Sequence, residues 1–211
     1  MAHDDHDHHH PPHPKQPDEE ETPFGYHQLM AQALEELLVE KGVVTPDQLR
    51  RGLEEQSSRH PANGTRLVAK AWKDPAFDAR VREDVNAAAR ELGLNPGDIP
   101  IRAVYDTDAE KNVIVCTLCS CYPTGLLGES PDWYKSRAYR SRVVREPRAV
   151  LQEFGTRVPE EVEIVVHDST AELRYIVVPQ RPAGTESLNE DQLVALLSRD
   201  CLIGTTLPQG T

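Results

Sequence analysis

The stretch NVIVCTLCSC, residues 112–121, leads from a short apolar run directly into three closely spaced cysteines. Its first four residues, 112–115, are rich in β-branched side chains, which pack well on a pleated surface, and therefore predict a strand. This strand ends where the cysteines begin, at Cys116. We therefore predict the fold from this strand and the segments on both sides of it.

On both sides of this stretch the sequence mixes short β-rich runs with helical segments. The other strands are expected at residues 101–105, 162–167 and 173–178. A loop marked by proline and glycine is expected at residues 123–131, and helices near residues 147–154 and 190–198. Strands and helices without regular βαβ alternation predict an α+β domain over residues 94–211.

Residues 24–93 are predicted to form a helical arm that precedes this domain. Apolar residues recur with a helical period between residues 29 and 38, and Gly42 suits the position after a helix end. Residues 45–48, Thr-Pro-Asp-Gln, have the pattern of a capping box and predict a second helix. A third helix is expected around residues 65–73, and a fourth from Asp74 to Leu92, ending at Gly93.

Residues 1–23 form a biased segment of histidine, aspartate and proline. Six of the nine histidines lie within residues 1–13, and almost no apolar residue accompanies them. Such a segment cannot bury enough apolar surface to fold, so we expect a disordered tail. Two interpretations stay open: a solvated tail, or a tail that binds divalent metal ions loosely.

Composition and charge exclude several classes of partner. The formal charge is −12 and the pI about 5.2, which argues against binding nucleic acid or an acidic membrane surface. No apolar run approaches the about 20 residues of a membrane span, and no signal peptide is recognisable, so a cytoplasmic protein is expected. Aromatic residues make up only 5% of the chain, which predicts a modest core that a partner chain completes.

The cysteines are distributed for metal chemistry rather than for disulfides. A secreted scaffold spreads its cysteines along the chain to close loops, whereas Cys116, Cys119 and Cys121 fall within six residues. The fourth cysteine, Cys201, lies eighty residues further on, and no second CxxC pair completes a zinc site. The cluster must therefore supply most of a coordination sphere by itself.

The segment Cys119-Ser120-Cys121 can form one continuous chelate. If the backbone amides of Ser120 and Cys121 lose their protons, two sulfurs and two nitrogens can lie in one plane, with Cys116 on the axial side and the sixth position open. Thiolates select softer transition metals, and amides deprotonate only for a strongly Lewis-acidic ion. These ligands indicate trivalent cobalt or iron. A labile zinc or iron–sulfur fragment and a group of ordinary thiols are the alternatives.

The excess negative charge of such a centre needs compensation. Three thiolates and two amidates carry five negative charges against three positive ones, and cations or hydrogen bonds must offset the difference. The arginines that follow the cysteines are the candidates: Arg140, Arg142, Arg145 and Arg148.

The segment VIVCTLCSCYP, residues 113–123, resembles the metal-binding loop of nitrile hydratase α subunits. The similarity continues through PDWYKS at residues 131–136, VVREPR at 143–148 and RPAGT at 181–185, and upstream through LVAKAW at 67–72. It covers roughly residues 65–205. The γ subunit of thiocyanate hydrolase shares this pattern, so the chain resembles it as well.

This resemblance implies a ligand set and a cofactor. Cys116, Cys119 and Cys121 would be the sulfur ligands, and the amides of Ser120 and Cys121 the nitrogen ligands. Cys119 would be oxidised to sulfinic acid and Cys121 to sulfenic acid, in keeping with the ease with which metal-bound thiolates oxidise. Thr117 favours cobalt, as one Co(III) per chain, over Fe(III). A β-type partner subunit would complete a hetero-oligomer and hold the oxidised sulfurs with its arginines.

The implied enzyme is a nitrile hydratase, a hydro-lyase that converts a nitrile to the amide. The metal would act as Lewis acid, and Cys121 and Cys119 would be the catalytic residues, with the Cys121 sulfenate as nucleophile or base. Common family members have Trp-Pro where this chain has Thr124-Gly125, and a His where it has Lys111. A substrate pocket lined by Tyr122, Thr124 and Gly125 that accepts bulky nitriles is therefore expected.

Two other functions stay open. The chain length favours nitrile hydratase, whereas the His/Asp-rich start and residues 200–204 favour a γ-type subunit of thiocyanate hydrolase. The third possibility is a non-enzymatic subunit that binds or delivers metal.

Overall fold

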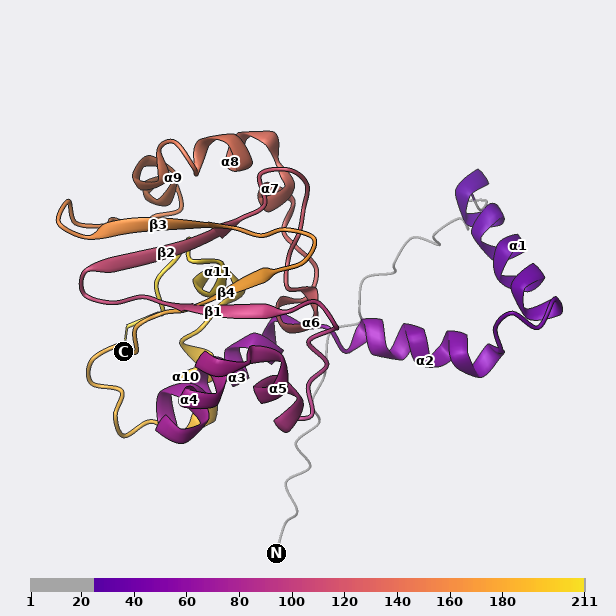
Figure 1. Ribbon diagram of the computed structural model, residues 1–211, viewed down its shortest axis with the longest axis horizontal. Helices are drawn as coiled ribbons and strands as arrows, with labels where there is room; N and C mark the ends of the chain where they lie inside the picture. Colours follow the sequence, from indigo (N-terminus) through magenta and orange to yellow (C-terminus); the bar gives the residue numbers. More distant parts are fainter. Residues whose placement is uncertain (1–24, 211) are drawn as a thin grey trace, which may run out of the picture. The chain divides into compact units, whose positions relative to one another are not determined.

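The computed structural model describes residues 25–210, and the tail predicted at residues 1–23 lies outside them (Figure 1). The chain divides into two compact units, with the boundary between Gly52 and Leu53. Within the described residues, no helix combines the length and the apolar character needed to cross a membrane.

The helices before and across this boundary bury none of their residues. Helix α1 spans Tyr26–Glu40, and helix α2 spans Pro46–Ser57. The predicted capping box of α2 is present, because the amide of Gln48 donates to Thr45 Oγ1 at 3.2 Å and the amide of Thr45 donates to Gln48 Oε1 at 2.8 Å. The apolar residues that predicted α1 are exposed, so this helix is amphipathic without covering a core of its own chain.

Three helices open the second unit: α3 at Pro61–Lys73, α4 at Pro75–Glu83 and α5 at Val85–Glu91. The prediction of one helix from Asp74 to Leu92 was wrong. Asp84 has an extended backbone, and its carboxylate accepts a hydrogen bond from the amide of Ala87 at 2.9 Å. Aspartate in this role begins a new helix, so the segment divides there into two.

The four expected strands are present, at Ile101–Tyr105 (β1), Glu110–Val115 (β2), Glu163–Asp168 (β3) and Arg174–Val178 (β4). They form two parallel pairs, β1 with β4 and β2 with β3, and β2 lies beside β4. In the second pair Val115 is opposite Asp168. The ends of β2 and β3 therefore lie next to each other, and the cysteines follow β2 at this point.

The remaining helices are short. They are α6 at Thr124–Leu127, α7 at Asp132–Lys135, α8 at Arg137–Arg142, α9 at Pro147–Glu153, α10 at Glu190–Ala195 and α11 at Arg199–Ile203. Helices α9 and α10 were predicted. Helix α6 lies within the predicted loop at residues 123–131, and α7, α8 and α11 were missed, because helices of four to six residues show too few turns for a periodic pattern.

The second unit has one continuous core, and the mixed helix and strand content confirms the predicted fold class. Helices α8 and α9 lie along one side of the strands, and α3 to α5 lie along the other (Figure 1). Leu67, Phe77 and Val85 bring α3, α4 and α5 into the same core as the strands. The division in packing therefore falls after residue 52, whereas the sequence predicted a boundary at residue 93.

Candidate metal centre

A carboxylate at the end of β3 holds the start of the cysteine loop. The side chain of Asp168 accepts one hydrogen bond from the Thr117 amide at 2.9 Å and another from the Thr117 hydroxyl at 2.6 Å. The Ser169 amide donates to the Val115 carbonyl at 2.7 Å. Hydrogen bonds to a charged carboxylate are stronger than neutral ones, so the chain leaves β2 in a fixed direction.

Asp168→Asn should weaken metal binding by the loop. Asparagine can still accept from the Thr117 amide and donate to the Thr117 hydroxyl, but it removes the carboxylate charge that strengthens both hydrogen bonds. We expect the Kd of the reduced, metal-free chain for Co²⁺ to rise about tenfold, equivalent to about 1.4 kcal/mol. Asp132→Asn, in an exposed position on α7, is the matched control. Equal affinity in the two variants would show that Asp168 does not organise the loop.

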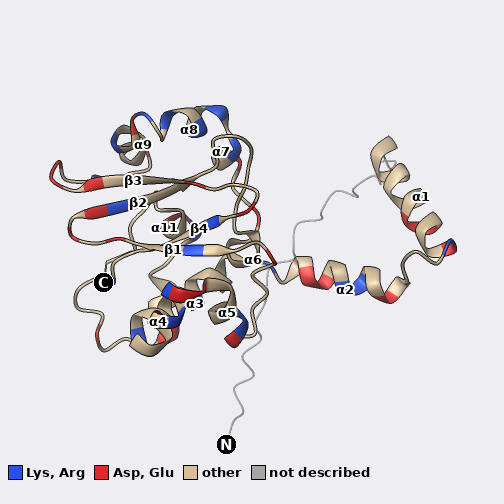
Figure 2. Cartoon of the chain, viewed as in Figure 1, with Lys and Arg blue, Asp and Glu red and all other residues tan. Residues whose placement is uncertain are grey.

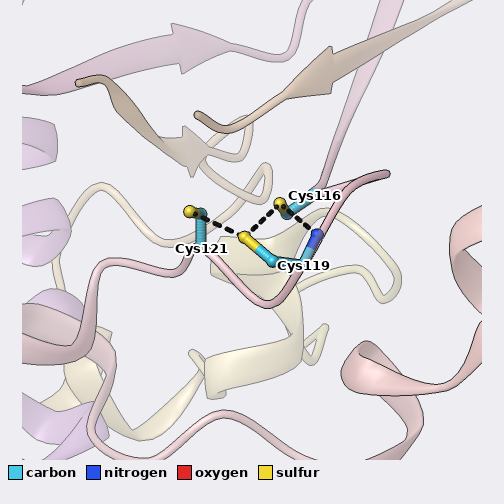
Figure 3. Close-up of side chains that lie close together, drawn as sticks. All are labelled: Cys116, Cys119 and Cys121. Atoms are coloured by element: carbon cyan, nitrogen blue, oxygen red, sulfur yellow. Dashed lines mark hydrogen bonds between the residues drawn. The ribbon is translucent and has the colours of Figure 1, made fainter. Parts of the chain in front are cut away.

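The three sulfurs of the loop converge on one point (Figure 3). Cys119 Sγ lies 3.3 Å from Cys116 Sγ and 3.1 Å from Cys121 Sγ, and all three lie within 4.8 Å of one another. Two sulfurs bound at right angles to one ion, each at about 2.3 Å, are about 3.3 Å apart, whereas tetrahedral angles would separate them by about 3.8 Å. The spacing therefore fits an octahedral centre better than a zinc site.

The three thiols differ in burial and in acidity. Cys116 is buried, Cys121 is partly buried and Cys119 is exposed, and all are free. Hydrogen bonds from the thiols of Cys121 and Cys116, and from the amides of Cys121 and Ser120, lower the pKa of Cys119 to about 7. Burial and the hydrogen bond to Cys119 raise the pKa of Cys121 to about 12, although the charge of Arg174 opposes this. Near neutral pH Cys119 is therefore more readily ionised than Cys121.

Alkylation of the metal-free, reduced chain should reflect this order. Because the pKa of Cys119 is lowered, its thiolate fraction, and with it the iodoacetamide rate, should rise through about pH 7 and then level off. The raised pKa of Cys121 keeps that thiol protonated, so its rate should still be rising well above pH 9. Peptide mass mapping at low reagent concentration should find Cys119 modified first. Earlier modification of Cys121 would contradict the hydrogen-bonding pattern of the loop.

Buried aromatic side chains form the floor beneath the loop. Tyr134 donates a hydrogen bond to the Cys121 carbonyl at 3.0 Å, and Tyr139 donates to the Ile114 carbonyl at 2.7 Å. Burial raises the pKa of both phenols, so both remain neutral donors. Edge-to-face contacts join these rings to Trp133 of α7, to Tyr122, which follows the last cysteine, and to Phe154, the residue after α9. The sequence prediction missed this role, although the close spacing of aromatic residues after the cysteines is a usable signal.

Two arginines approach the loop, and only one of them was predicted. Arg140 donates to the Thr117 carbonyl at 3.3 Å. The other three candidates are engaged elsewhere: Arg142 pairs with Glu146 and Glu153, Arg145 bonds the Ser141 carbonyl, and Arg148 bonds the carbonyls of residues 158, 159 and 162. Arg174, at the start of β4, is the second arginine, since its charge acts on Cys121.

The residues predicted to line a substrate pocket have different environments. Tyr122 is 5% exposed and packs on Tyr134 with ring centroids 5.0 Å apart. Gly125 is buried, and a Cβ there would lie 2.5 Å from the Asn95 carbonyl oxygen, so glycine permits close packing of two backbone segments. Both residues are therefore buried within this chain. Thr124 is partly exposed and stays the candidate.

Comparison with known proteins places this geometry in a family. Residues 26–206 match the family model described as nitrile hydratase, alpha chain. The low-molecular-weight cobalt-containing nitrile hydratase subunit alpha of Rhodococcus rhodochrous is 46% identical over 184 residues, which is 84% of this chain and 86% of the relative. The thiocyanate hydrolase subunit gamma of Thiobacillus thioparus is 43% identical over 194 residues, 86% of this chain and 80% of the relative.

Solved structures agree with the sequence relatives. A recombinant thiocyanate hydrolase with partially modified cobalt centres superposes with a TM-score of 0.80 at 41% identity, covering 88% of this chain and 91% of that one. A double mutant of the Fe-type nitrile hydratase from Comamonas testosteroni Ni1 gives 0.75 at 40% identity, covering 86% and 90%.

The fold and the three-cysteine loop define a metal-binding enzyme subunit. The chain belongs to the nitrile hydratase α-chain family, as its resemblance predicted.

Proposed function

We propose that this chain is the metal-carrying subunit of a cobalt-type nitrile hydratase and takes part in hydrating a nitrile to its amide. The observation that carries this proposal is the convergence of three sulfurs at octahedral spacing, in a chain whose relatives include cobalt-containing nitrile hydratase α subunits. Thr117 follows the first cysteine, which favours cobalt over iron in this family. One Co(III) per chain would be held by the sulfurs of Cys116, Cys119 and Cys121 and the amide nitrogens of Ser120 and Cys121.

A bound trivalent cobalt ion would supply Lewis acidity at the exposed face of the loop. The residues of this chain do the rest. Asp168 and Tyr134 hold the two ends of the loop through Thr117 and the Cys121 carbonyl, so that the sulfurs keep their spacing. Cys119, as sulfinic acid, and Cys121, as sulfenic acid, present oxygen atoms toward the substrate. The Cys121 oxygen acts as nucleophile toward the nitrile carbon or as base toward water.

We further propose that the chain works in a hetero-oligomer with a β-type partner. Both the nitrile hydratase and the thiocyanate hydrolase relatives are themselves subunits. Helix α1 exposes a row of large apolar side chains, which marks an interaction surface: Tyr26, Leu29, Met30, Leu34 and Leu37. Leu118, at the tip of the metal loop, is 88% exposed. A partner that covers Leu118 would also enclose the loop.

The test is reconstitution with a β-type partner subunit, followed by assays with a nitrile panel and with thiocyanate. Formation of amide from nitrile supports the proposal. Thiocyanate hydrolysis without nitrile turnover would instead support a γ-type subunit, which the TM-score of 0.80 to thiocyanate hydrolase keeps as the second candidate. Cobalt loading without turnover of either substrate would support a metal-binding or metal-delivery subunit.

Thr124→Trp should change which nitriles the complex accepts. Thr124 follows the metal loop and is partly exposed, and a tryptophan there would add a large rigid wall. Small nitriles should gain apolar contact, at about 25 cal/mol per Å² buried, while bulky ones are excluded. The kcat/KM for a bulky nitrile should fall at least about tenfold relative to a small one, a shift of about 1.4 kcal/mol. Ser130→Trp serves as control, and an unchanged ratio would mean that Thr124 does not face the substrate.

A further inference from the structure

Four buried side-chain polar atoms in the described part of the chain lack a hydrogen-bond partner: Tyr122 Oη, Arg140 Nε, Ser169 Oγ and Arg174 Nη1. All four belong to residues around the cysteine loop. Tyr122 follows Cys121, and Ser169 follows the carboxylate that holds Thr117. A buried polar group without a partner costs free energy, so their concentration at one site indicates that the site accepts charge or polar groups that the metal-free chain lacks.

Two of these four groups are guanidinium ions. Arg140 projects from α8 to the Thr117 carbonyl, and Arg174, whose Nη1 is buried, begins β4, the strand that lies beside β2 and its cysteine loop. Neither forms an ion pair with a carboxylate among residues 25–210, in contrast to Arg142, which pairs with two glutamates. Figure 2 shows several basic residues on α7 and α8, in a chain that is strongly acidic as a whole.

The two guanidinium charges are equal in number to the excess negative charges of the complete ligand set around a trivalent ion. Three thiolates leave an excess of one negative charge around Co²⁺, and three thiolates with two amidates leave an excess of two around a trivalent ion. Burying such an excess is costly unless cations lie next to it, and a guanidinium is the cation best suited to an interior position because it is weakly hydrated. Arg140 and Arg174 contribute two positive charges.

We propose that Arg140 and Arg174 are charge-compensating residues that let this chain hold its metal before any partner chain is in place. The inference rests on the proposed function only in that the loop binds cobalt through its thiolates. Neither arginine touches the reacting atoms, so both are positioning residues for the metal centre and not catalytic residues.

The test is a titration of the full-length, reduced, metal-free chain with Co²⁺ under anaerobic conditions, without partner chains. Absorption from sulfur-to-cobalt charge transfer reports binding. Arg174→Met and Arg140→Met should each raise the Kd at least about tenfold, and the double variant about a hundredfold. Arg174→Lys, which keeps the charge, should stay within about threefold of the native chain. Arg137→Met, an exposed arginine on α8, is the matched control and should leave the Kd unchanged.

A second measurement separates charge compensation from a structural role. Because each guanidinium is partly buried without an ion pair, its removal should leave the thermal midpoint of the metal-free chain unchanged or higher. A merely structural arginine would instead lower that midpoint when replaced. Native-like Kd values in both methionine variants, or loss of affinity that only follows loss of stability, would overturn the inference. If the native chain binds Co²⁺ no better than Cys119→Ser, the proposed metal centre itself fails, which is a separate result.

Discussion

Replacement of Cys119 or Cys121 by serine is expected to abolish cobalt retention and the sulfur-to-cobalt charge-transfer absorption. The sulfurs of Cys119 and Cys121 lie 3.1 Å apart, and the Cys119 sulfur also lies 3.3 Å from the Cys116 sulfur. A serine hydroxyl is a hard ligand that ionises far less readily than a thiol, so the remaining set no longer suits a soft transition metal. Purified complex expressed with cobalt should contain about one cobalt per chain, and either variant less than about a tenth of that.

Cys201→Ser is the matched control for these variants. Cys201 is buried in α11, where its sulfur contacts the hydroxyls of Ser198 and Thr206, and it belongs to no metal cluster among the described residues. Serine preserves those polar contacts, so the cobalt content should stay at the native level. Full cobalt retention by the Cys119 or Cys121 variant would rule out the five-ligand chelate.

Gly204→Ala is expected to destabilise the fold by at least about 3 kcal/mol. Gly204 ends α11 with φ +93°, a left-handed conformation that costs other residues about 1–2 kcal/mol. A Cβ there would also collide with the Asn112 carbonyl oxygen and lie 2.9 Å from Val113 Cα. Both atoms are backbone of β2 and cannot turn aside, so the strand or the helix must shift. Urea unfolding of the metal-free chain measures the loss.

Gly155→Ala separates the conformational cost of a positive φ from the cost of the Cβ collision. Gly155 also has a positive φ, +84°, but nothing lies within 4 Å of the position of its Cβ. Its replacement should therefore cost only the conformational part, about 1–2 kcal/mol. Similar losses in both variants would show that α11 and β2 are not packed as closely as the structure indicates. Because β2 leads into Cys116, the Gly204 variant should also bind Co²⁺ more weakly.

The sequence predicted the regular elements well where they are long and patterned. The strand at residues 101–105 coincides with β1, and the helices around residues 29–38 and 147–154 correspond to α1 and α9. Failures came where a local signal was short or had two interpretations. Asp84 can lie within a helix or begin one, and the sequence alone did not show that its carboxylate caps α5.

The metal ligands could be predicted from the sequence because their geometry is local. Cys116, Cys119 and Cys121 are joined by so few bonds that their spacing nearly determines how the sulfurs and amides can meet one ion. The surroundings of the loop could not be predicted in this way. Asp168, which bonds Thr117, lies 51 residues further along the chain. Gly204, which packs against the Asn112 backbone, ends α11, a helix that was not predicted from the sequence.

What the sequence by itself determined is the kind of protein, a chain of mixed helices and strands with three cysteines arranged to bind a transition metal. Only the tertiary structure decided that Asp168, Tyr134 and Tyr139 hold that loop, and which of the four predicted arginines, Arg140, reaches it. It also decided that Tyr122 and Gly125 pack inward. The physical reason is that these contacts depend on which distant segments the core brings together. Aspartate, tyrosine and arginine are common residues. Neither a periodic pattern nor a spacing along the chain predicts their roles.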